Sequence, residues 1–452
     1  MTASEHLGRF AVAPIERDAP VRQAARRHLL DGLGNAIAAR RRGAGSAALR
    51  IARGLGGPGE AAPIGDTDRI SAPAAAFADG VLVHALDFDD THGRALVHPT
   101  AVTLPAALAV GQEVGASGAA VVDATAVGLE VACRIGAAVP HGFHGAGLHA
   151  TGAVGPLAAA ATAGRLAGLD ATTVTAALGI AGSSSGGLLE FLDTGADTKT
   201  LHPGSASFNG ILAARLAEAG AAGPVSVLEG RRGLFATMSR VEPDLSVVEQ
   251  GLGRDWTAAG IGIKPYPSCQ LMHAALDAAR AAIGDTPAAT IDAVSIDLHP
   301  DSLDIVGARR PSARPLSPYD AKFDVRWSVA ALLLDGAVTL QTYDEASIAR
   351  PEVAELAARI DLRATSADGP AADAPARVAL RTNAGDEQVG EVACSRGTAG
   401  HPLSDDELVA KFVAGCDHDD RAPALAHRVL GLDDEPTIDD LLRVCAALAE
   451  RH

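Results

Sequence analysis

The chain has 452 residues, with 55 acidic and 38 basic side chains and a formal net charge of −17 at pH 7. This length exceeds one ordinary domain, so we expect two, each with an ample core. A nucleic-acid surface needs clustered lysine and arginine, and the acidic balance argues against one. A small anionic substrate is not excluded, because a few local cations outweigh distant charge. Hydrophobic residues make up 48% but aromatic residues only 3%, which favours closely packed helices.

Cysteine usage and the lack of export features indicate a soluble, cytoplasmic protein. The N-terminus has no basic region followed by an apolar run, so we expect no secretory signal. Apolar stretches such as 100–110 are too short and too alanine-rich to span a bilayer. The cysteines are scattered, odd in number and without a C-x-x-C pair, which is typical of reduced thiols: Cys133, Cys269, Cys394, Cys416 and Cys445.

Apolar residues recur at helical spacing through the first half of the chain. Helices are predicted at 21–42, 71–86, 105–112, 118–136, 150–166, 170–182 and 203–219. The character changes near Lys264. Alternating β-branched residues predict a strand at 290–299 and two strands within 377–394, with a helix at 323–334 between them. The second half therefore begins as an α+β region.

The C-terminal part returns to helix. Ser404 and Glu407 form a capping-box pattern, and a last helix is predicted at 437–450. We therefore predict a mainly α fold with an inserted α+β domain. Residues 1–262 and 398–452 would form a large all-helical domain, and 263–397 a smaller lid domain between them.

The stretch HALDFDDTHGRALVHP, residues 84–99, concentrates polar groups that are costly to bury without partners. It contains three carboxylates, a hydroxyl and imidazoles: Asp87, Asp89, Asp90, Thr91, His92 and His98. Two interpretations stand side by side. The acids are solvated in a polar loop after a helix, or the stretch is part of a functional site.

Part of this stretch, Asp87 to Thr91, fits the D-x-D-x-T pattern of haloacid-dehalogenase-type phosphatases. In that chemistry an aspartate is the nucleophile and Mg²⁺ lies beside it. The pattern requires an apolar strand before it, and 81–83 is the only candidate. Because nothing downstream alternates strand and helix as that fold demands, the phosphatase is a remote alternative.

Other motifs are weaker. The run 182–186 fits G-x-S-x-G and contains Ser184, but it lies between two alanine-rich helices and not after a strand. His141, His144 and His149 resemble a zinc cluster only in composition, because no acidic or thiol ligand is near in sequence. We therefore predict no metal site and no cofactor.

Further polar groups lie at junctions between loops and helices, flanked by glycine and proline. They occur in the segments 148–152, 199–204 and 264–273, which contain His149, Lys199, His202, Lys264, Tyr266 and His273. Loops positioned by a rigid scaffold are where binding and catalytic residues concentrate. We therefore expect these segments to line a shared cleft with the 84–99 stretch.

At these residues the chain resembles the MmgE/PrpD superfamily. The matching motifs are HALDFDDTH, the segments around His149 and Lys199, KPYPSCQLMHAALDAA and the PLSDDELVAKF tail. Activities in the superfamily include 2-methylcitrate dehydratase, cis-aconitate decarboxylase and iminodisuccinate epimerase. The resemblance implies a helical domain with an inserted lid, a homodimer, and no metal or organic cofactor. The resemblance also implies that the site contains Asp87, Thr91, His98, His149, Lys199 and His273.

The chain departs from the dehydratases of propionate metabolism after the acidic stretch. His92 and HPTAVTLP stand where an aromatic residue and a longer segment would be expected. This disfavours methylcitrate as the substrate. We therefore predict a cofactor-independent lyase, a dehydratase or a decarboxylase, for a small di- or tricarboxylate. An epimerase of an aminopolycarboxylate such as iminodisuccinate would use the same proton chemistry and remains the alternative.

Such reactions build negative charge on a carboxylate, which fixed cations in a dry cleft stabilise. We assign this role to Lys199 and His273, and general acid–base chemistry to His98 and His149 because imidazole titrates near neutral pH. Asp87 is expected to orient a histidine. Contacts to the substrate are expected from Thr91, His92, Ser184, His202, Lys264 and Tyr266.

Overall fold

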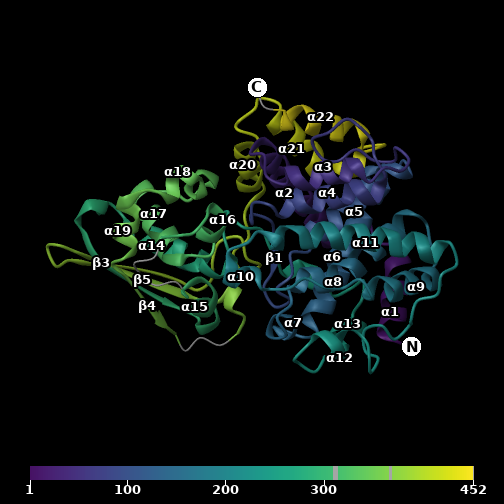
Figure 1. Ribbon diagram of the computed structural model, residues 1–452, viewed down its shortest axis with the longest axis horizontal. Helices are drawn as coiled ribbons and strands as arrows, with labels where there is room; N and C mark the ends of the chain where they lie inside the picture. Colours follow the sequence, from purple (N-terminus) through teal and green to yellow (C-terminus); the bar gives the residue numbers. More distant parts are fainter. Residues whose placement is uncertain (309–313, 366–368, 451–452) are drawn as a thin grey trace. The chain divides into compact units, whose positions relative to one another are not determined.

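The computed structural model describes residues 1–308, 314–365 and 369–450, and the chain divides into two compact units (Figure 1). Unit 1 is built from Met1–Glu190, Thr198–Ile261 and the C-terminal part from Ser404 onward. Unit 2 comprises Phe191–Asp197 and Gly262–Leu403. No feature of the sequence predicts that the short segment Phe191–Asp197 belongs to the second unit.

Unit 1 is helical. Its first segment contains α1 (Ala3–Val12), α2 (Pro20–Arg41), α3 (Ser46–Gly54), α4 (Ala72–His84), α5 (Thr100–Glu113), α6 (Gly118–Ala137), α7 (Gly142–Gly145), α8 (Ala150–Leu166) and α9 (Ala171–Gly182). Its second contains the 3₁₀ turn η1 (Thr198–Thr200), α11 (Leu201–Glu218), α12 (Leu234–Met238), α13 (Leu245–Glu249) and η2 (Thr257–Gly260). Its third contains α20 (Asp405–Gly415), α21 (Ala422–Leu430), η7 (Leu432–Asp434) and α22 (Asp439–Ala449).

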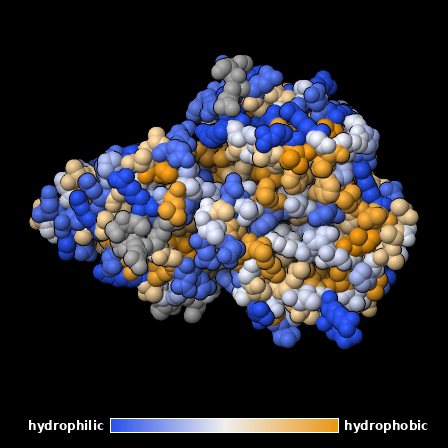
Figure 2. Space-filling view, in the orientation of Figure 1, coloured by the Kyte–Doolittle hydropathy of each residue, from blue (hydrophilic) through white to orange (hydrophobic). Residues whose placement is uncertain are grey.

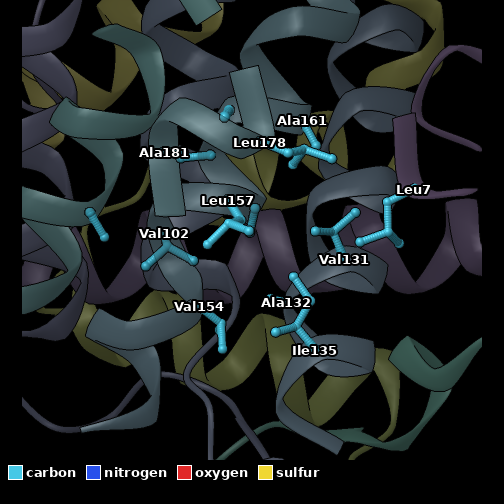
Figure 3. Close-up of a cluster of buried hydrophobic side chains, with 14 of the residues drawn as sticks. Leu7, Val102, Val131, Ala132, Ile135, Val154, Leu157, Ala161, Leu178 and Ala181 are labelled. Carbon is cyan, nitrogen blue, oxygen red and sulfur yellow. The ribbon is translucent and has the colours of Figure 1, made fainter. Parts of the chain in front are cut away.

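Small side chains allow the central helices of unit 1 to approach closely. A Cβ atom added to Gly80 of α4 would lie 2.7 Å from the Gly204 backbone of α11, and one added to Gly210 would lie 2.4 Å from the Ala159 side chain of α8. Figure 3 shows the adjoining core, where Leu157 packs among Val102, Val131 and other aliphatic side chains. Because these helices pack closely, the backbone that carries the polar site has little freedom to move.

Unit 2 contains a four-stranded sheet in the order β4-β3-β5-β6. β3 (Ile291–Leu298) pairs in parallel with β4 (Ile360–Ala364) and antiparallel with β5 (Ala376–Thr382), which pairs with β6 (Glu387–Val392). The helices of this unit include α10 (Phe191–Thr194), α14 (His273–Ile283), α15 (Pro300–Val306), α16 (Pro318–Ala321), α17 (Val325–Asp335), α18 (Glu345–Ile348) and α19 (Pro351–Ala357). β2 (Ile261–Gly262) lies where the chain passes from unit 1 to unit 2.

At the level of fold class, the prediction of a mainly helical protein with a smaller mixed α and β region is confirmed. The predicted helices and three of the strands lie where the sequence pattern places them. The prediction did not include β4 or several helices, among them α1, α3, α14 and α21. β4 is only five residues long, and four of its side chains are exposed or half-buried in succession, so period-2 alternation does not mark it.

Two motifs that the sequence analysis discounted lack the strand that their chemistry requires. The segment 81–83 lies inside α4 and not in a strand, so the D-x-D-x-T pattern lacks the strand that phosphatase chemistry requires. The G-x-S-x-G run follows α9, again without a strand before it. Among the described residues, no helix is both long and apolar enough to cross a membrane.

Asp79 of α4 gives a test of burial in unit 1. Its side chain is 1% exposed, its Oδ1 accepts a 2.7 Å hydrogen bond from the Ile64 N–H, and burial raises its pKa from 3.8 to about 8. The folded protein therefore holds a proton that the unfolded chain releases above about pH 4. The free energy of unfolding consequently decreases as the pH rises from about 4 to about 8.

The variant Asp79→Asn keeps the acceptor oxygen but has no proton to lose. We expect Tm of the unchanged protein to fall more between pH 5 and pH 8 than Tm of the variant. Calorimetry at the two pH values makes the comparison, and equal falls in Tm would show that Asp79 is ionised in the fold.

Candidate functional site

The acidic stretch forms a tight loop between α4 and α5. α4 ends at His84, and Asp87 follows with φ of 49°, in the left-handed region that non-glycine residues adopt rarely. Leu96, near the other end of the loop, has φ of 51°. Strained backbone of this kind persists where surrounding contacts over-determine it, and it is common at functional sites. Asp87, Asp89 and Asp90 are all fully buried.

Lys199 supplies the counter-charge of Asp87. Its Nζ donates to Asp87 Oδ1 at 2.8 Å, and the lysine side chain itself is almost fully buried. Lys199 lies in η1, immediately before α11, so the ion pair joins two segments that are 112 residues apart. The sequence predicted that Asp87 orients a histidine, whereas the structure pairs its carboxylate with an ammonium group.

The imidazole contact belongs to Asp89. Its Oδ2 lies 2.8 Å from His84 Nδ1 and 3.8 Å from His98 Nδ1. His84 is fully buried at the last position of α4. A carboxylate against Nδ1 fixes the orientation and tautomer of an imidazole and raises its basicity.

Backbone contacts fix the tautomer of His98. Its Nδ1 lies 2.8 Å from the carbonyl oxygen of Asp90 and 3.1 Å from Thr91 Oγ1. Because a carbonyl oxygen can only accept, Nδ1 carries the proton and donates it. Nε2 is therefore the basic nitrogen of neutral His98. Asp90 in turn contacts His28 Nδ1 at 2.8 Å, and its carboxylate accepts from the Thr100 hydroxyl.

His149 completes the cluster from the N-cap of α8. Its ring centroid lies 5.7 Å from that of His98 and 5.7 Å from that of His84, and 5.3 Å from that of His202. Its Nδ1 lies 3.1 Å from Nδ1 of His202, so only one of these two nitrogens carries the shared proton. Burial, followed by Lys199 and the other imidazoles, lowers the pKa of His149 well below its ordinary value.

Two further imidazoles at this end of unit 1 are kept neutral. Burial, then His84 and Lys199, lowers the pKa of His202 to about 4. Burial also lowers the pKa of His144, whose ring lies 6.3 Å from that of His149, to about 4. Burial therefore favours the neutral forms of His144, His149 and His202.

The C-terminal return of the chain supports the acidic loop. Lys411 of α20 donates from Nζ to the Phe88 carbonyl oxygen at 2.8 Å, and its Nζ lies 3.8 Å from the centroid of the Phe88 ring. The same ammonium pairs with Asp31 of α2 at 2.5 Å. Burial raises the pKa of Asp31 to about 6 although Lys411 opposes the shift. Lys411 thus ties α2 and α20 to the backbone between Asp87 and Asp89.

Three other predicted residues of unit 1 have different surroundings. Thr91 is buried and contacts His98 through its hydroxyl. His92 accepts a hydrogen bond from the Ala95 N–H on Nδ1, and burial lowers its pKa to about 4; these contacts stabilise the turn of the loop. Ser184 is exposed after the end of α9.

The remaining predicted residues lie in unit 2 and form a group of their own. Lys264 is buried, and the Tyr266 hydroxyl donates to Asp277 Oδ1 at 2.6 Å. Burial and Asp277 raise the pKa of Tyr266. His273 Nε2 lies 3.1 Å from the Ser268 carbonyl oxygen, and its ring meets the Tyr266 ring edge-on at 5.3 Å.

Two groups of side chains in unit 1 have donor atoms close enough to hold a metal ion. They are His84 with His98 and His149, and His84 with Asp87 and Asp89, each with ligand atoms within 4.8 Å of one another. These residues also form the Asp87–Lys199 ion pair, the Asp89–His84 contact and the ring contacts described above.

The sequence analysis missed several residues of this site. Asp89 and Asp90 were noted in the acidic stretch without a role, and His84, His28 and Lys411 were not singled out. His84 could have been found, because it lies near the end of the predicted helix 71–86 and close to three acids. His28 and Lys411 carry no local motif, and only the fold brings them to the loop.

Comparisons with known proteins identify the family of the chain. Residues 5–245 match the MmgE/PrpD N-terminal domain and residues 266–427 the MmgE/PrpD C-terminal domain. The chain is 30% identical to human cis-aconitate decarboxylase over 65% of this chain and 62% of that protein, which is less than two thirds of the human relative. It is 29% identical to cis-aconitate decarboxylase of Aspergillus terreus over 86% of this chain and 84% of that protein.

A cis-aconitate decarboxylase-like protein of Aspergillus oryzae is 26% identical over 95% of this chain and 94% of its own length. The resemblance noted from the motifs is thus confirmed by matches that cover most of the sequence. With both domain models present in order, the chain belongs to the MmgE/PrpD family.

Proposed function

We propose that unit 1 carries the active centre of a lyase that acts on an aconitate-like acid, with decarboxylation of cis-aconitate as the favoured reaction. The single observation that carries the proposal is the buried cluster of imidazoles beside the Asp87–Lys199 ion pair. Two relatives are named cis-aconitate decarboxylase, which favours decarboxylation over dehydration and epimerisation.

The chemistry follows from the charges. When the carbon–carbon bond to the leaving carboxylate breaks, CO₂ departs and the electron pair spreads over the remaining conjugated carboxylate. A buried ammonium such as Lys199 stabilises this charge strongly because water is excluded. The N-terminus of α8, which begins next to His149, points backbone N–H groups and the positive end of the helix dipole toward bound anions.

The reaction then needs one proton for the carbanion. We assign the proton transfer to His98 and His149, which lie within ring contact of each other. The basic Nε2 of His98 is the atom through which this residue exchanges protons, since Nδ1 is held by the Asp90 carbonyl. Substrate contacts are proposed for Thr91 and His202 from the same cluster. For Lys264, Tyr266 and His273 of unit 2, the proposed contacts rest on the family resemblance.

The reaction is tested by incubating the protein in D₂O with cis-aconitate, citrate, methylcitrate and iminodisuccinate, followed by NMR. We expect CO₂ loss from cis-aconitate with one deuterium bound at carbon in the product. Because no step of this chemistry requires a metal, we expect the rate to survive exhaustive treatment with EDTA. Water loss or exchange with another acid, without CO₂ release, would contradict decarboxylation.

The role of Lys199 is tested by Lys199→Met. This variant removes the cation and leaves Asp87 buried without its counter-charge, so we expect lower Tm and kcat/KM reduced by roughly a hundredfold or more. The matched control is Lys199→Met combined with Asp87→Asn, which removes both charges. Tm should largely recover in the double variant while kcat/KM stays low. Recovery of kcat/KM together with Tm would show that Lys199 serves stability alone.

We also propose a homodimer, as the family resemblance implies. Leu201, Leu212 and Leu216 of α11 are 41%, 36% and 50% exposed, and their spacing places them on one face of the helix. Hydrophobic side chains gather over the part of unit 1 where Figure 1 shows α4, α5 and α11 (Figure 2). Contiguous exposed apolar surface of this kind is typical of an interface between proteins.

Light scattering at micromolar concentration should therefore give about twice the 45.6 kDa mass of one chain. Replacement of Leu212 and Leu216 by glutamate should yield monomers, because burying two carboxylates without partners is costly. A monomeric mass for the unchanged protein would contradict the proposed dimer, and a dimeric glutamate variant would place the interface elsewhere.

A further inference from the structure

His84 is a central member of the histidine cluster to which neither the sequence motifs nor the proposed reaction assigns a part. Its side chain is fully buried, and Nδ1 lies 2.8 Å from Asp89 Oδ2. Its ring lies 4.7 Å from that of His98 and stacks at 5.7 Å on that of His149. Within the described part of the chain, Nε2 of His84 has no hydrogen-bond partner.

These imidazoles cannot all be charged at once, because like charges in a buried site repel strongly. The distribution of the proton depends on the groups that surround His84. The acidic loop contributes Asp87, Asp89 and His98, and the N-cap of α8 contributes His149. Lys199 comes from η1 and His202 from α11, and His28 of α2 is paired with Asp90 of the loop.

The helix ends distinguish the three central histidines. His84 occupies the last turn of the 13-residue helix α4, where the negative end of the helix dipole favours a cation. His149 is the N-cap of α8, and His98 directly precedes Pro99, the N-cap of α5. At these two positions the positive end of the dipole disfavours an imidazolium. Asp89 reinforces the difference, since its Oδ2 is 1.0 Å closer to Nδ1 of His84 (2.8 Å) than to that of His98 (3.8 Å).

We propose that His84 and Asp89 are a positioning pair. In the resting protein the pair holds the extra proton of the cluster as an imidazolium on His84, and during turnover His84 supplies this proton to the neighbouring imidazoles. The inference rests on the proposed lyase function. In each cycle a C–C bond breaks, CO₂ leaves with no electron pair from that bond, and an imidazolium N–H proton forms the new C–H bond. The neutral imidazole then regains a proton from His84, and the cluster regains one proton from solvent.

The direct test is the variant Asp89→Asn, which keeps the shape of the side chain and removes its charge. We expect kcat to fall about tenfold to a hundredfold with little change in KM, because the substrate does not contact Asp89. Loss of the carboxylate weakens proton binding by the cluster. The alkaline limb of the kcat–pH profile should therefore move to lower pH by about one unit or more.

Two companion variants isolate this effect. His84→Gln keeps an N–H for Asp89 but cannot carry a proton, and it should show a similar fall in kcat without an additive loss when combined with Asp89→Asn. Asp79→Asn removes a buried carboxyl from the same helix outside the cluster and should leave kcat and its pH profile unchanged. An unshifted alkaline limb in folded Asp89→Asn or His84→Gln would overturn the proposal.

A second readout does not depend on turnover. In protein labelled with ¹⁵N-histidine, His84 should show the nitrogen shifts of a doubly protonated imidazole at pH 7, and those of a neutral imidazole in Asp89→Asn. A neutral His84 in the unchanged protein would overturn the positioning pair even if cis-aconitate is decarboxylated. A charged His84 together with failure to turn over cis-aconitate would instead reject the proposed reaction and leave the pair intact.

Discussion

The burial of three carboxylates within four consecutive residues governs the construction of this site. Asp87, Asp89 and Asp90 are inaccessible to solvent, and an isolated buried carboxylate is strongly unfavourable. Each is therefore compensated by a different group: Lys199, His84 and His28. Lys199 and His28 come from segments distant in sequence, so the loop between α4 and α5 acquires its geometry only when the fold of unit 1 is complete.

The segment that returns to unit 1 after unit 2 also contacts the acidic loop. Lys411 of α20 binds the Phe88 carbonyl oxygen and pairs with Asp31 of α2, so the last segment of the chain fixes the centre of the acidic loop. Removal of one partner of a buried ion pair is costly. The C-terminal helices are therefore tied to the polar site as well as to the hydrophobic core.

The sequence was sufficient for much of the local structure. Periodicity placed most of the longer helices, and the segments around His149 and Lys199 were predicted to be junctions before helices, as they are. It could not predict pairings. Asp87 and Asp89 are two residues apart and equally acidic, and only tertiary structure decides that one meets Lys199 and the other His84. Ser184, for which a substrate contact was predicted, is exposed after the end of α9.

Helix direction adds a property that no single residue carries. α4 ends at the cluster, whereas α5 and α8 begin there. Two positive helix ends and Lys199 favour the binding of anions, and one negative end together with Asp89 favours a cation on His84. The order of helices in the chain thus separates the place where negative charge is stabilised from the place where a proton is held. A lyase that forms a carbanion and then protonates it needs a group that stabilises negative charge close to a group that holds a proton. These must be different groups, so that the proton is not lost to the stabilised anion too early.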